Sequence, residues 1–200
     1  GGIVLISSSL DDRTVHELTR LEIPIVLCDR LIPGTPFPAV LIDDFKAAYE
    51  AVTYLIKQGH ARIAHLAGPN NVNSSENRKR GYVQAMLDAG LEPFVSIGEF
   101  NFESGVQQAA FVLEEFDPTA IFASNDLLAL GAIQEIQRRG RRIPEDVAII
   151  GCDDISFSRM SRPTLSTISI PVYQIGVTAG EILDQLIKGV SVEPKTIIVE

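Results

Sequence analysis

The sequence predicts an α/β protein built on parallel sheets. Short apolar segments typical of buried strands alternate with longer amphipathic segments typical of helices along nearly the whole chain. Glycines follow several of the helix-like segments, at the position where a helix commonly ends. Strands that alternate with helices of this length form parallel sheets with helices on both faces. In such sheets, ligands bind at the carboxyl ends of the strands.

The strand-like segments are short and bounded by polar or turn-forming residues. The first reads GIVLISS, and a later one reads ARIAHLAG. None of them reaches the roughly 18 apolar residues that a membrane-spanning helix needs. In chain order we expect strands or extended segments at residues 2–8, 23–29, 38–44, 61–68, 95–100, 118–126, 146–154, 166–171 and 195–200.

The helix-like segments carry apolar residues at helical spacing. Residues 45–58 show this most clearly, with positions i, i+3, i+4 and i+7 apolar and Gly59 at the stop position. We expect Ser74 or Ser75 to cap one helix, and Asp126 to cap another. The predicted helices are residues 11–20, 45–58, 74–90, 103–116, 126–140 and 172–188.

The charge of the chain disfavours binding to polyanions. The net charge is −9, whereas affinity for nucleic acid backbones and anionic membranes comes from clustered Lys and Arg. One dense basic run, residues 138–142, lies at the end of a predicted helix. We interpret it as a complement to the negative end of the helix dipole, with a nucleic-acid patch as the alternative.

The cysteines and the amino-terminal residues favour a cytoplasmic protein. Cys28 and Cys152 are far apart in the sequence, and they end apolar runs, which predicts buried free thiols in a reducing compartment. Residues 1–10 are apolar but have neither the basic start nor the cleavage site of a signal peptide.

Polar residues end most of the predicted strands, and they favour binding over catalysis. The three histidines lie in separate elements without metal-ligand spacing or a nucleophile–base pattern. The phosphate-binding loop motifs are absent, so we expect no metal, no cofactor and no enzyme activity. The strand-end residues are Ser7–Ser9, Asp29–Arg30, Asp43–Asp44, Ser124–Asp126 and Asp153–Asp154.

Several motifs together resemble one family. The segments VLIDDFKAAYEAVTYLIKQGHARIAHLAGP, ENRKRGY, PTAIFASNDLLALGAI, IPEDVAIIGCDD and RPTLSTI follow one another in the order of lac repressor-type (LacI/GalR) transcriptional regulators. The resemblance covers essentially the whole chain. It implies the effector-binding core of such a regulator, with a periplasmic-binding-protein-like type I fold. That fold has two doubly wound parallel-sheet lobes joined by three crossovers.

The resemblance also implies how the chain divides. Residues 1–42 and 168–189 would form the first lobe, and residues 43–167 and 190–200 the second. The first lobe would be incomplete at its N-terminus. The family's helix-turn-helix, through which such a regulator contacts DNA, is absent from this sequence.

The same resemblance implies the ligand-binding residues. Arg78 and Asp153 match the family's effector-binding arginine and strand-ending aspartate. Asn125, Asp29 and Phe100 match further residues of the interlobe cleft, Phe100 as an aromatic that stacks on a sugar or base. The alternative for Arg78 is a solvated surface arginine, and that for Phe100 is an ordinary core position. We expect Asp154 to serve the following loop, because side chains alternate along a strand, and Ser7–Ser9 have weaker support as cleft residues.

The function implied is a ligand sensor of a dimeric DNA-binding regulator. A small molecule, in the first place a sugar, would bind between the lobes and alter operator binding. The alternative is a solute-binding protein of a transport system, which shares the fold and the cleft. An enzyme on a Rossmann-like scaffold is disfavoured, because the sequence offers no catalytic groups.

Overall fold

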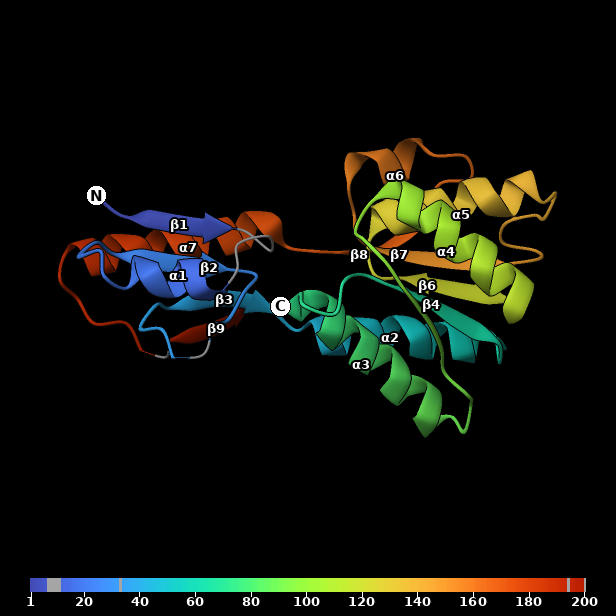
Figure 1. Cartoon of the computed structure of the whole chain (residues 1–200), viewed down its shortest axis with the longest axis horizontal. Coiled ribbons are helices and arrows are strands. Elements are labelled where there is room, and N and C mark those ends of the chain that lie inside the picture. The colour runs from blue at the N-terminus through green and yellow to red at the C-terminus, as the bar shows by residue number, and fades with distance from the viewer. Residues whose placement is uncertain (7–11, 33, 194, 200) are drawn as a thin grey trace. The chain divides into compact units, whose positions relative to one another are not determined.

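A computed structural model describes residues 1–6, 12–32, 34–193 and 195–199. It divides into two compact units, which Figure 1 shows with their elements labelled. Unit 1 comprises Gly1–Asp43 and Pro171–Glu200, and unit 2 comprises Asp44–Ile170. Each unit contains one parallel sheet flanked by helices, so the α/β class predicted from the alternation of segments is confirmed.

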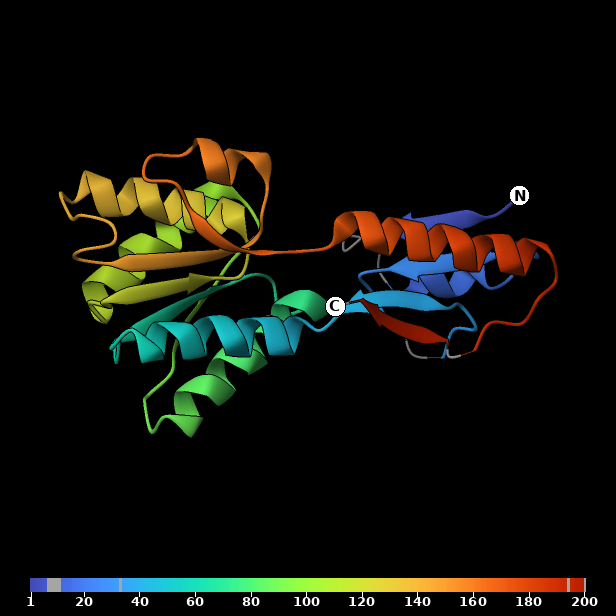
Figure 2. The ribbon, with the colours of Figure 1, turned by 180° about the vertical axis from the view of Figure 1, so that it is seen from behind.

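Unit 1 is built on a four-stranded parallel sheet in the order β1-β2-β3-β9. The strands are β1 (Ile3–Ile6), β2 (Ile25–Cys28), β3 (Ala39–Ile42) and β9 (Thr196–Val199). Helix α7 (Val172–Ile187) lies on one face of the sheet and the short α1 (Asp12–Leu18) on the other, as the front and rear views show (Figures 1 and 2). Every residue of β2 is buried, because both faces of this inner strand are covered.

The assignment of the C-terminal residues to the second lobe is wrong. The predicted division placed residues 190–200 there, but β9 pairs in parallel with β3, from Ala39↔Thr196 to Ile42↔Val199. Without β9, the outer edge of β3 would expose a row of unpaired backbone N–H and C=O groups. Pairing with β9 gives these groups hydrogen-bond partners. Within the described residues the chain passes from one unit to the other twice, so the third predicted crossover is not found there.

Unit 2 is built on a five-stranded parallel sheet in the order β5-β4-β6-β7-β8. The strands are β4 (Ile63–Ala67), β5 (Phe94–Ile97), β6 (Ala120–Ala123), β7 (Ala148–Asp153) and β8 (Ser166–Ser169). The chain places β5 on one side of β4 and β6 on the other. This is the doubly wound order, in which a crevice opens at the carboxyl ends of the strands where the winding reverses.

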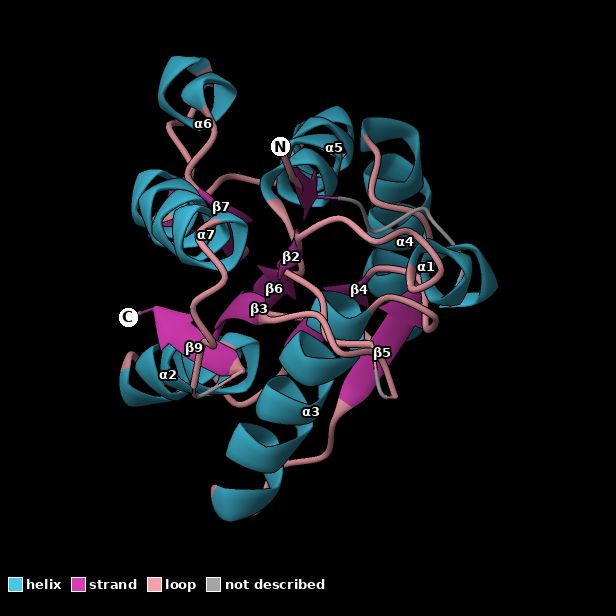
Figure 3. Ribbon diagram, turned by 90° about the vertical axis from the view of Figure 1, so that its left-hand side faces the viewer, coloured by secondary structure: helices cyan, strands magenta, loops and turns pink. Residues whose placement is uncertain are grey.

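Helices cover both faces of the unit 2 sheet (Figure 3). Helices α2 (Asp44–Lys57) and α3 (Asn73–Asp88) cover one face, and α4 (Phe102–Glu115) and α5 (Asp126–Arg138) cover the other. The two apolar layers meet the all-buried strands β4 and β6, which explains why these strands read as continuous apolar runs. The sequence did not predict α6 (Ser156–Met160), which is a single short helix after β7.

The helix ends follow the predicted signals in part. Gly59 and Gly140 follow α2 and α5 with φ of 95° and 72°, a conformation that glycine adopts without strain. Helix α3, however, begins after Val72 without a side-chain cap, so the predicted serine caps are wrong.

The basic run at the end of α5 is held in ion pairs within the chain. Glu135 is buried, and Arg138 and Arg139 bind it through Nε at 2.7 Å each, which lowers the pKa of that carboxyl to about 2. Arg141 pairs with Asp117 and Arg142 with Asp146. These contacts favour the structural interpretation of the run over a nucleic-acid patch.

Candidate functional site

The candidate site is centred on Arg78, which is buried on α3 in unit 2. Its Nε atom donates to Oδ1 of Asp44 over 2.7 Å, and its Nη1 atom donates to the Ser124 carbonyl oxygen over 2.5 Å. The same Nη1 atom lies 3.2 Å from Oδ1 of Asp153. Asp44 begins α2, Ser124 follows β6 and Asp153 ends β7, so the guanidinium joins three elements at the carboxyl end of the sheet. The interpretation of Arg78 as a solvated surface residue is wrong.

Two polar atoms of this cluster are available to a ligand. Among the described residues, neither Nη2 of Arg78 nor Oδ2 of Asp153 has a hydrogen-bond partner. Neither is a fully buried orphan atom, so both reach solvent. The cluster therefore keeps one guanidinium nitrogen that can donate and one carboxylate oxygen that can accept. This arrangement can bind a group that both accepts and donates hydrogen bonds.

Asp153 is held in an unusual environment. Burial raises the pKa of its carboxyl to about 6, and the Arg78 guanidinium only partly offsets this effect. Its backbone φ is 123°, a region that residues with side chains rarely adopt. Such strain persists where the surrounding structure fixes the residue, and it is frequent at ligand sites.

The neighbouring Asp154 has a different role, as expected. Its carboxylate binds Arg159 of α6, with Nη2 of the arginine 2.7 Å from Oδ2. Its backbone N–H donates to Thr167 Oγ1. Asp154 therefore orders the segment after β7, and only Asp153 joins the Arg78 cluster.

The buried histidine His65 stabilises the Arg78 cluster through Ser124. The ring of His65, on β4, is stacked with those of Tyr82 and Phe122, whose centroids are 5.0 and 4.9 Å away. Its Nδ1 lies 2.9 Å from the Phe122 carbonyl oxygen, and its Nε2 lies 3.3 Å from Ser124 Oγ. Burial lowers the pKa of His65 to about 4, so the ring is neutral near pH 7. The neutral ring accepts from the Ser124 hydroxyl and helps to fix the residue whose carbonyl binds Arg78.

The cap of α5 is Asn125 and not Asp126. Asn125 Oδ1 accepts from the Leu128 N–H over 2.9 Å, which is the bond of a helix N-cap. Asp126 instead accepts from the Ile155 N–H and from the hydroxyls of Ser158 and Thr167. The prediction of Asp126 as the cap is therefore wrong. Capping uses only the oxygen of the Asn125 amide, and Nδ2 makes no hydrogen bond among the described residues.

Phe100 lies in the loop between β5 and α4, over the backbone that follows β4. A Cβ atom placed on Gly68 would come within 2.3 Å of its ring, so the ring requires a glycine there. Phe100 is half-buried and packs against the apolar layer beneath α4 and α5. Part of the ring is therefore core, as the alternative interpretation held, and part remains accessible at the carboxyl end of the sheet.

Asp29 follows β2 in unit 1 and is exposed. Its φ is 56°, and its backbone N–H donates to the Val40 carbonyl oxygen. Within its own unit it lies at the carboxyl end of a strand, the position where we expected it. Ser7–Ser9 lie outside the described residues.

Sequence reasoning noted Asp44 as a strand-end residue but did not assign it to the site. An acidic residue at the first turn of a helix is common, because it complements the helix dipole. Only the fold reveals its second role, since Arg78 lies 34 positions away in the sequence.

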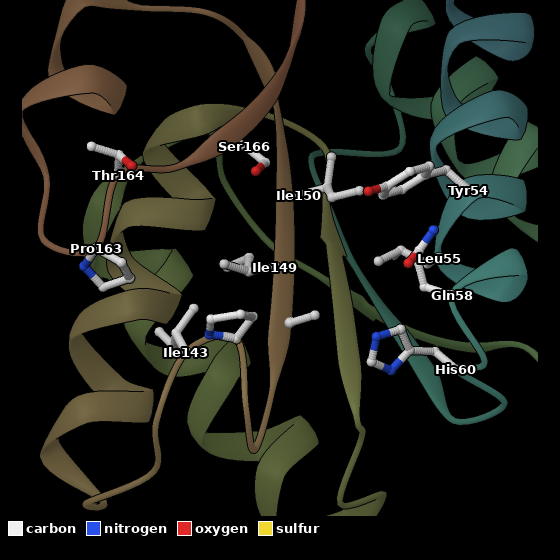
Figure 4. A pocket seen from close by; sticks show the side chains of 12 residues that line it. Tyr54, Leu55, Gln58, His60, Ile143, Ile149, Ile150, Pro163, Thr164 and Ser166 are labelled. Carbon is white, nitrogen blue, oxygen red and sulfur yellow. The ribbon is translucent and has the colours of Figure 1, made fainter.

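A groove of about 470 Å³ lies at the other end of the unit 2 sheet (Figure 4). Its lining includes Tyr54 and Gln58 of α2, Ile143 and Pro144 before β7, and Ser166 at the start of β8. None of the candidate residues lines it, so it is distinct from the candidate site.

The described ranges contain no group of His, Cys, Asp and Glu that could hold a metal ion. They also contain no helix that is long and apolar enough to cross a membrane.

Comparisons with known proteins identify the family of this chain. Residues 52–200 match the family model of the periplasmic binding protein-like domain. The HTH-type transcriptional repressor CytR of Escherichia coli K12 is 38% identical over 180 residues, which make up 88% of this chain and 52% of that protein. The chain thus spans about half the length of this relative.

Solved structures of transcriptional regulators share the fold. A regulatory protein of the LacI family from Chloroflexus aggregans has a TM-score of 0.91 at 35% identity, covering 99% of this chain and 73% of that one. A complex of the transcriptional regulator CelR with cellobiose has a TM-score of 0.92 at 33% identity, covering 100% of this chain and 63% of that one. These relatives are described as regulators and not as enzymes. The chain belongs to the LacI family of transcriptional regulators, and it corresponds to their effector-binding domain with the periplasmic-binding-protein-like fold.

Proposed function

We propose that this chain is the ligand-sensing domain of a DNA-binding transcriptional regulator. It would bind a small molecule, with a sugar as the favoured class, and thereby control operator binding. The observation that carries the proposal is the Arg78–Asp153 pair at the carboxyl end of a doubly wound sheet, which keeps one donor and one acceptor atom without a partner among the described residues. The relative CelR, whose complex with cellobiose is known, supports a sugar as the first class to test.

Each candidate residue has a proposed role. Arg78 donates from Nη2 and Asp153 accepts at Oδ2, so that together they hold two neighbouring hydroxyls. Asn125 donates from Nδ2, and the accessible part of Phe100 contacts the apolar face of a sugar ring. The family resemblance adds Asp29 of unit 1 as a further contact.

The ligand would act on DNA binding by changing the balance between conformations. It can shift that balance only by the difference in its affinity for the two states. In the full-length protein, in the cytoplasm, the readout would be the placement of two helix-turn-helix headpieces, whose separation must match the operator. We propose a homodimer for this reason. The apolar side chains of Phe157 and Met160 on α6 are 66% and 70% exposed, and a second subunit could cover them.

A solute-binding protein of a transport system is the competing proposal. It would use the same fold and the same side chains. The similarity to repressors favours the regulator. The upstream coding sequence distinguishes the two, because a helix-turn-helix supports a regulator and a signal peptide supports a transport protein.

Thermal unfolding with a panel of sugars, sugar phosphates and purines tests the proposal. A ligand at 100 times its Kd should stabilise the wild-type chain by about 2.7 kcal/mol. Arg78→Ala and Asp153→Ala should abolish this gain. Arg80→Ala, which removes an exposed arginine of the same helix, should keep it. An equal gain in all variants would contradict the site.

A further inference from the structure

We propose that Asp126 is a positioning residue, which holds the segment after β7 so that the side chain of Asp153 reaches Arg78. Asp126 would not contact the effector itself. It would act through Thr167 of β8 and through the backbone of Asp153–Ile155, which we call the β7–α6 link. This inference rests on the proposed function, because the site that Asp126 supports is the one proposed there.

The β7–α6 link has a backbone that residues with side chains rarely adopt. Asp153 has a φ of 123° and Asp154 a φ of 54°, and both values lie on the positive side that favours glycine. Such a backbone persists only where the contacts around it hold it in place. The link therefore needs partners that fix its peptide groups.

Two side chains bind both backbone N–H groups that follow Asp153. The N–H of Asp154 donates to Thr167 Oγ1 over 3.3 Å, and the N–H of Ile155 donates to Oδ2 of Asp126 over 2.9 Å. The Thr167 hydroxyl in turn donates to Oδ1 of Asp126 over 2.5 Å. We call these three hydrogen bonds the Asp126 clamp. They connect the orientation of Asp153 to the position of one carboxylate.

The sequence of β7 leaves room for this carboxylate. Asp126 begins α5 after β6, and its side chain passes β7 to reach β8. At the crossing point β7 has Gly151, which pairs with Thr167 in the ladder between the two strands. A Cβ atom on Gly151 would overlap Oδ1 of Asp126, so a side chain there would displace the carboxylate.

The environment of Asp126 suits a carboxylate that accepts and does not donate. Asp126 is fully buried, and it has no cation as a partner among the described residues. Three donors satisfy it instead, namely the Ile155 N–H and the hydroxyls of Ser158 and Thr167. The first turn of α5, where Asp126 lies, also favours a negative charge. An amide at this position would turn its NH2 group toward one of the donors.

The alternative is that Asp126 only anchors α6. Its Oδ2 atom accepts from the Ser158 hydroxyl over 2.6 Å, and this bond ties the short helix to α5. Ser158 makes no bond to the β7–α6 link through that hydroxyl, whereas Thr167 binds the link directly. Variants of Ser158 and Thr167 therefore separate the two roles.

Titration calorimetry measures the effect on binding, with cellobiose, glucose and adenosine as probes. Thr167→Val removes the hydroxyl of the clamp but keeps the shape of the side chain and the charge of Asp126. It should bind a probe of the wild type at least about tenfold more weakly, as should Asp126→Asn, whereas Thr167→Ser should restore most of the affinity. Ser158→Ala and Ser161→Ala, which remove nearby hydroxyls outside the clamp, should stay within about twofold of wild type. Urea unfolding checks that each variant is folded, and Thr167→Ala replaces Thr167→Val if the latter is not.

An NMR titration of the Asp153 carboxyl gives a second readout that needs no ligand. In the wild type the pKa of this carboxyl is raised to about 6, chiefly by burial, with Asp126 and Asp44 adding to the rise and Arg78 opposing it. Thr167→Val keeps all of these charges. Without the clamp the carboxyl should turn toward solvent, and its pKa should fall toward the ordinary value of 3.8. Thr167→Ser should keep the raised pKa.

An unchanged pKa of Asp153 in Thr167→Val would overturn the inference. Wild-type affinity in Thr167→Val, or an equal loss of affinity in Ser158→Ala, would also overturn it. The proposed function would stand in these cases, provided that Arg78→Ala abolishes binding. If no probe binds the wild type, the proposed function is contradicted for these ligands, and the NMR titration alone decides whether Asp126 positions Asp153.

Discussion

Nε of Arg78 and Oδ1 of Asp44 lie 2.7 Å apart, and both side chains are only 6% exposed. Two charges removed from water in this way depend on each other, because a buried charge left without its partner costs about 3–5 kcal/mol. The pair therefore joins the start of α2 to α3 and also fixes the guanidinium that faces the candidate site.

This pair should show strong coupling in a double-mutant cycle. Asp44→Asn and Arg78→Met should each lower the free energy of unfolding by about 3 kcal/mol, since each removes one charge of this buried pair. The double variant should be less destabilised than the sum of the two by about 2 kcal/mol. Urea unfolding measures all four proteins. The Arg62–Asp117 pair is a matched control, because both side chains are 54% exposed and its coupling should stay below about 1 kcal/mol. Equal coupling in the two pairs would show that the buried pair has no special role.

Asn125 should have separable structural and ligand-binding roles. Asn125→Ala removes the cap of α5 and should cost about 1 kcal/mol of stability. Asn125→Asp keeps a good cap, and therefore the stability, but it loses the Nδ2 donor and adds a negative charge. We expect this variant to bind effector at least about tenfold more weakly, as measured by titration calorimetry.

Asn101 provides the control for that comparison. It caps α4 with the same bond, from the Ser104 N–H to Oδ1 over 2.8 Å, and it is exposed. Asn101→Ala should lose similar stability, whereas Asn101→Asp should keep both stability and effector affinity. If Asn125→Asp bound effector as the wild type does, Asn125 would be a cap and nothing more.

His65 should make the fold sensitive to mild acid. Its pKa falls from 6.5 to about 4 on folding, so its stabilising contribution is complete above pH 6.5 and is lost as the pH falls toward 4. Between pH 7 and pH 5 this loss amounts to about 2 kcal/mol. Asp153 acts in the opposite direction, because its raised pKa means that its contribution is present below pH 3.8 and is lost as the pH rises through about 6.

Urea unfolding of His65→Gln at pH 7 and pH 5 tests whether His65 makes the fold less stable as the pH falls. The difference in stability between the two pH values should change by about 2 kcal/mol relative to wild type, whatever the variant loses at pH 7. His16→Gln, which changes an exposed histidine, should behave as the wild type does. An unchanged pH dependence in His65→Gln would show that His65 titrates normally in the fold.

Gly68 should be intolerant of a side chain as long as Phe100 is present. A Cβ atom there would lie 2.3 Å from the ring, and such overpacking typically costs about 1–3 kcal/mol. Gly68→Ala should therefore destabilise the chain in the wild-type background and much less in Phe100→Ala. Additive effects in the double variant would mean that the two residues do not restrict each other.

The sequence was informative where the determinants are local. Strand and helix positions follow from the period of the apolar residues, and Gly59 and Gly140 mark helix ends because both take a positive φ. The choice between Asn125 and Asp126 as cap was not resolvable in this way, since both are good caps and adjacent. What decides is that Asn125 has extended backbone angles, φ −149° and ψ 171°, and so precedes the first helical residue.

The features that the sequence did not predict depend on contacts between distant parts of the chain. The position of β9 follows from which strand edge accepts it, and nothing in the residues 195–200 specifies β3. The role of Asp44 depends on Arg78, and that of His65 on Phe122 and Ser124, which are 57 and 59 positions away. The family resemblance identified Arg78 and Asp153 as ligand-binding residues. The residues that support them could be identified only from the fold.

The most direct test of the central claim is the effector affinity of two adjacent single variants. Asp153 and Asp154 are chemically identical neighbours, but only Asp153 contacts Arg78, whereas Asp154 binds Arg159. Titration calorimetry with an effector identified by the panel should show Asp153→Asn weakened by about 10- to 100-fold and Asp154→Asn within about twofold of wild type. Unchanged affinity in Asp153→Asn, or an equal loss in both variants, would contradict the assignment of the ligand site to the Arg78–Asp153 pair.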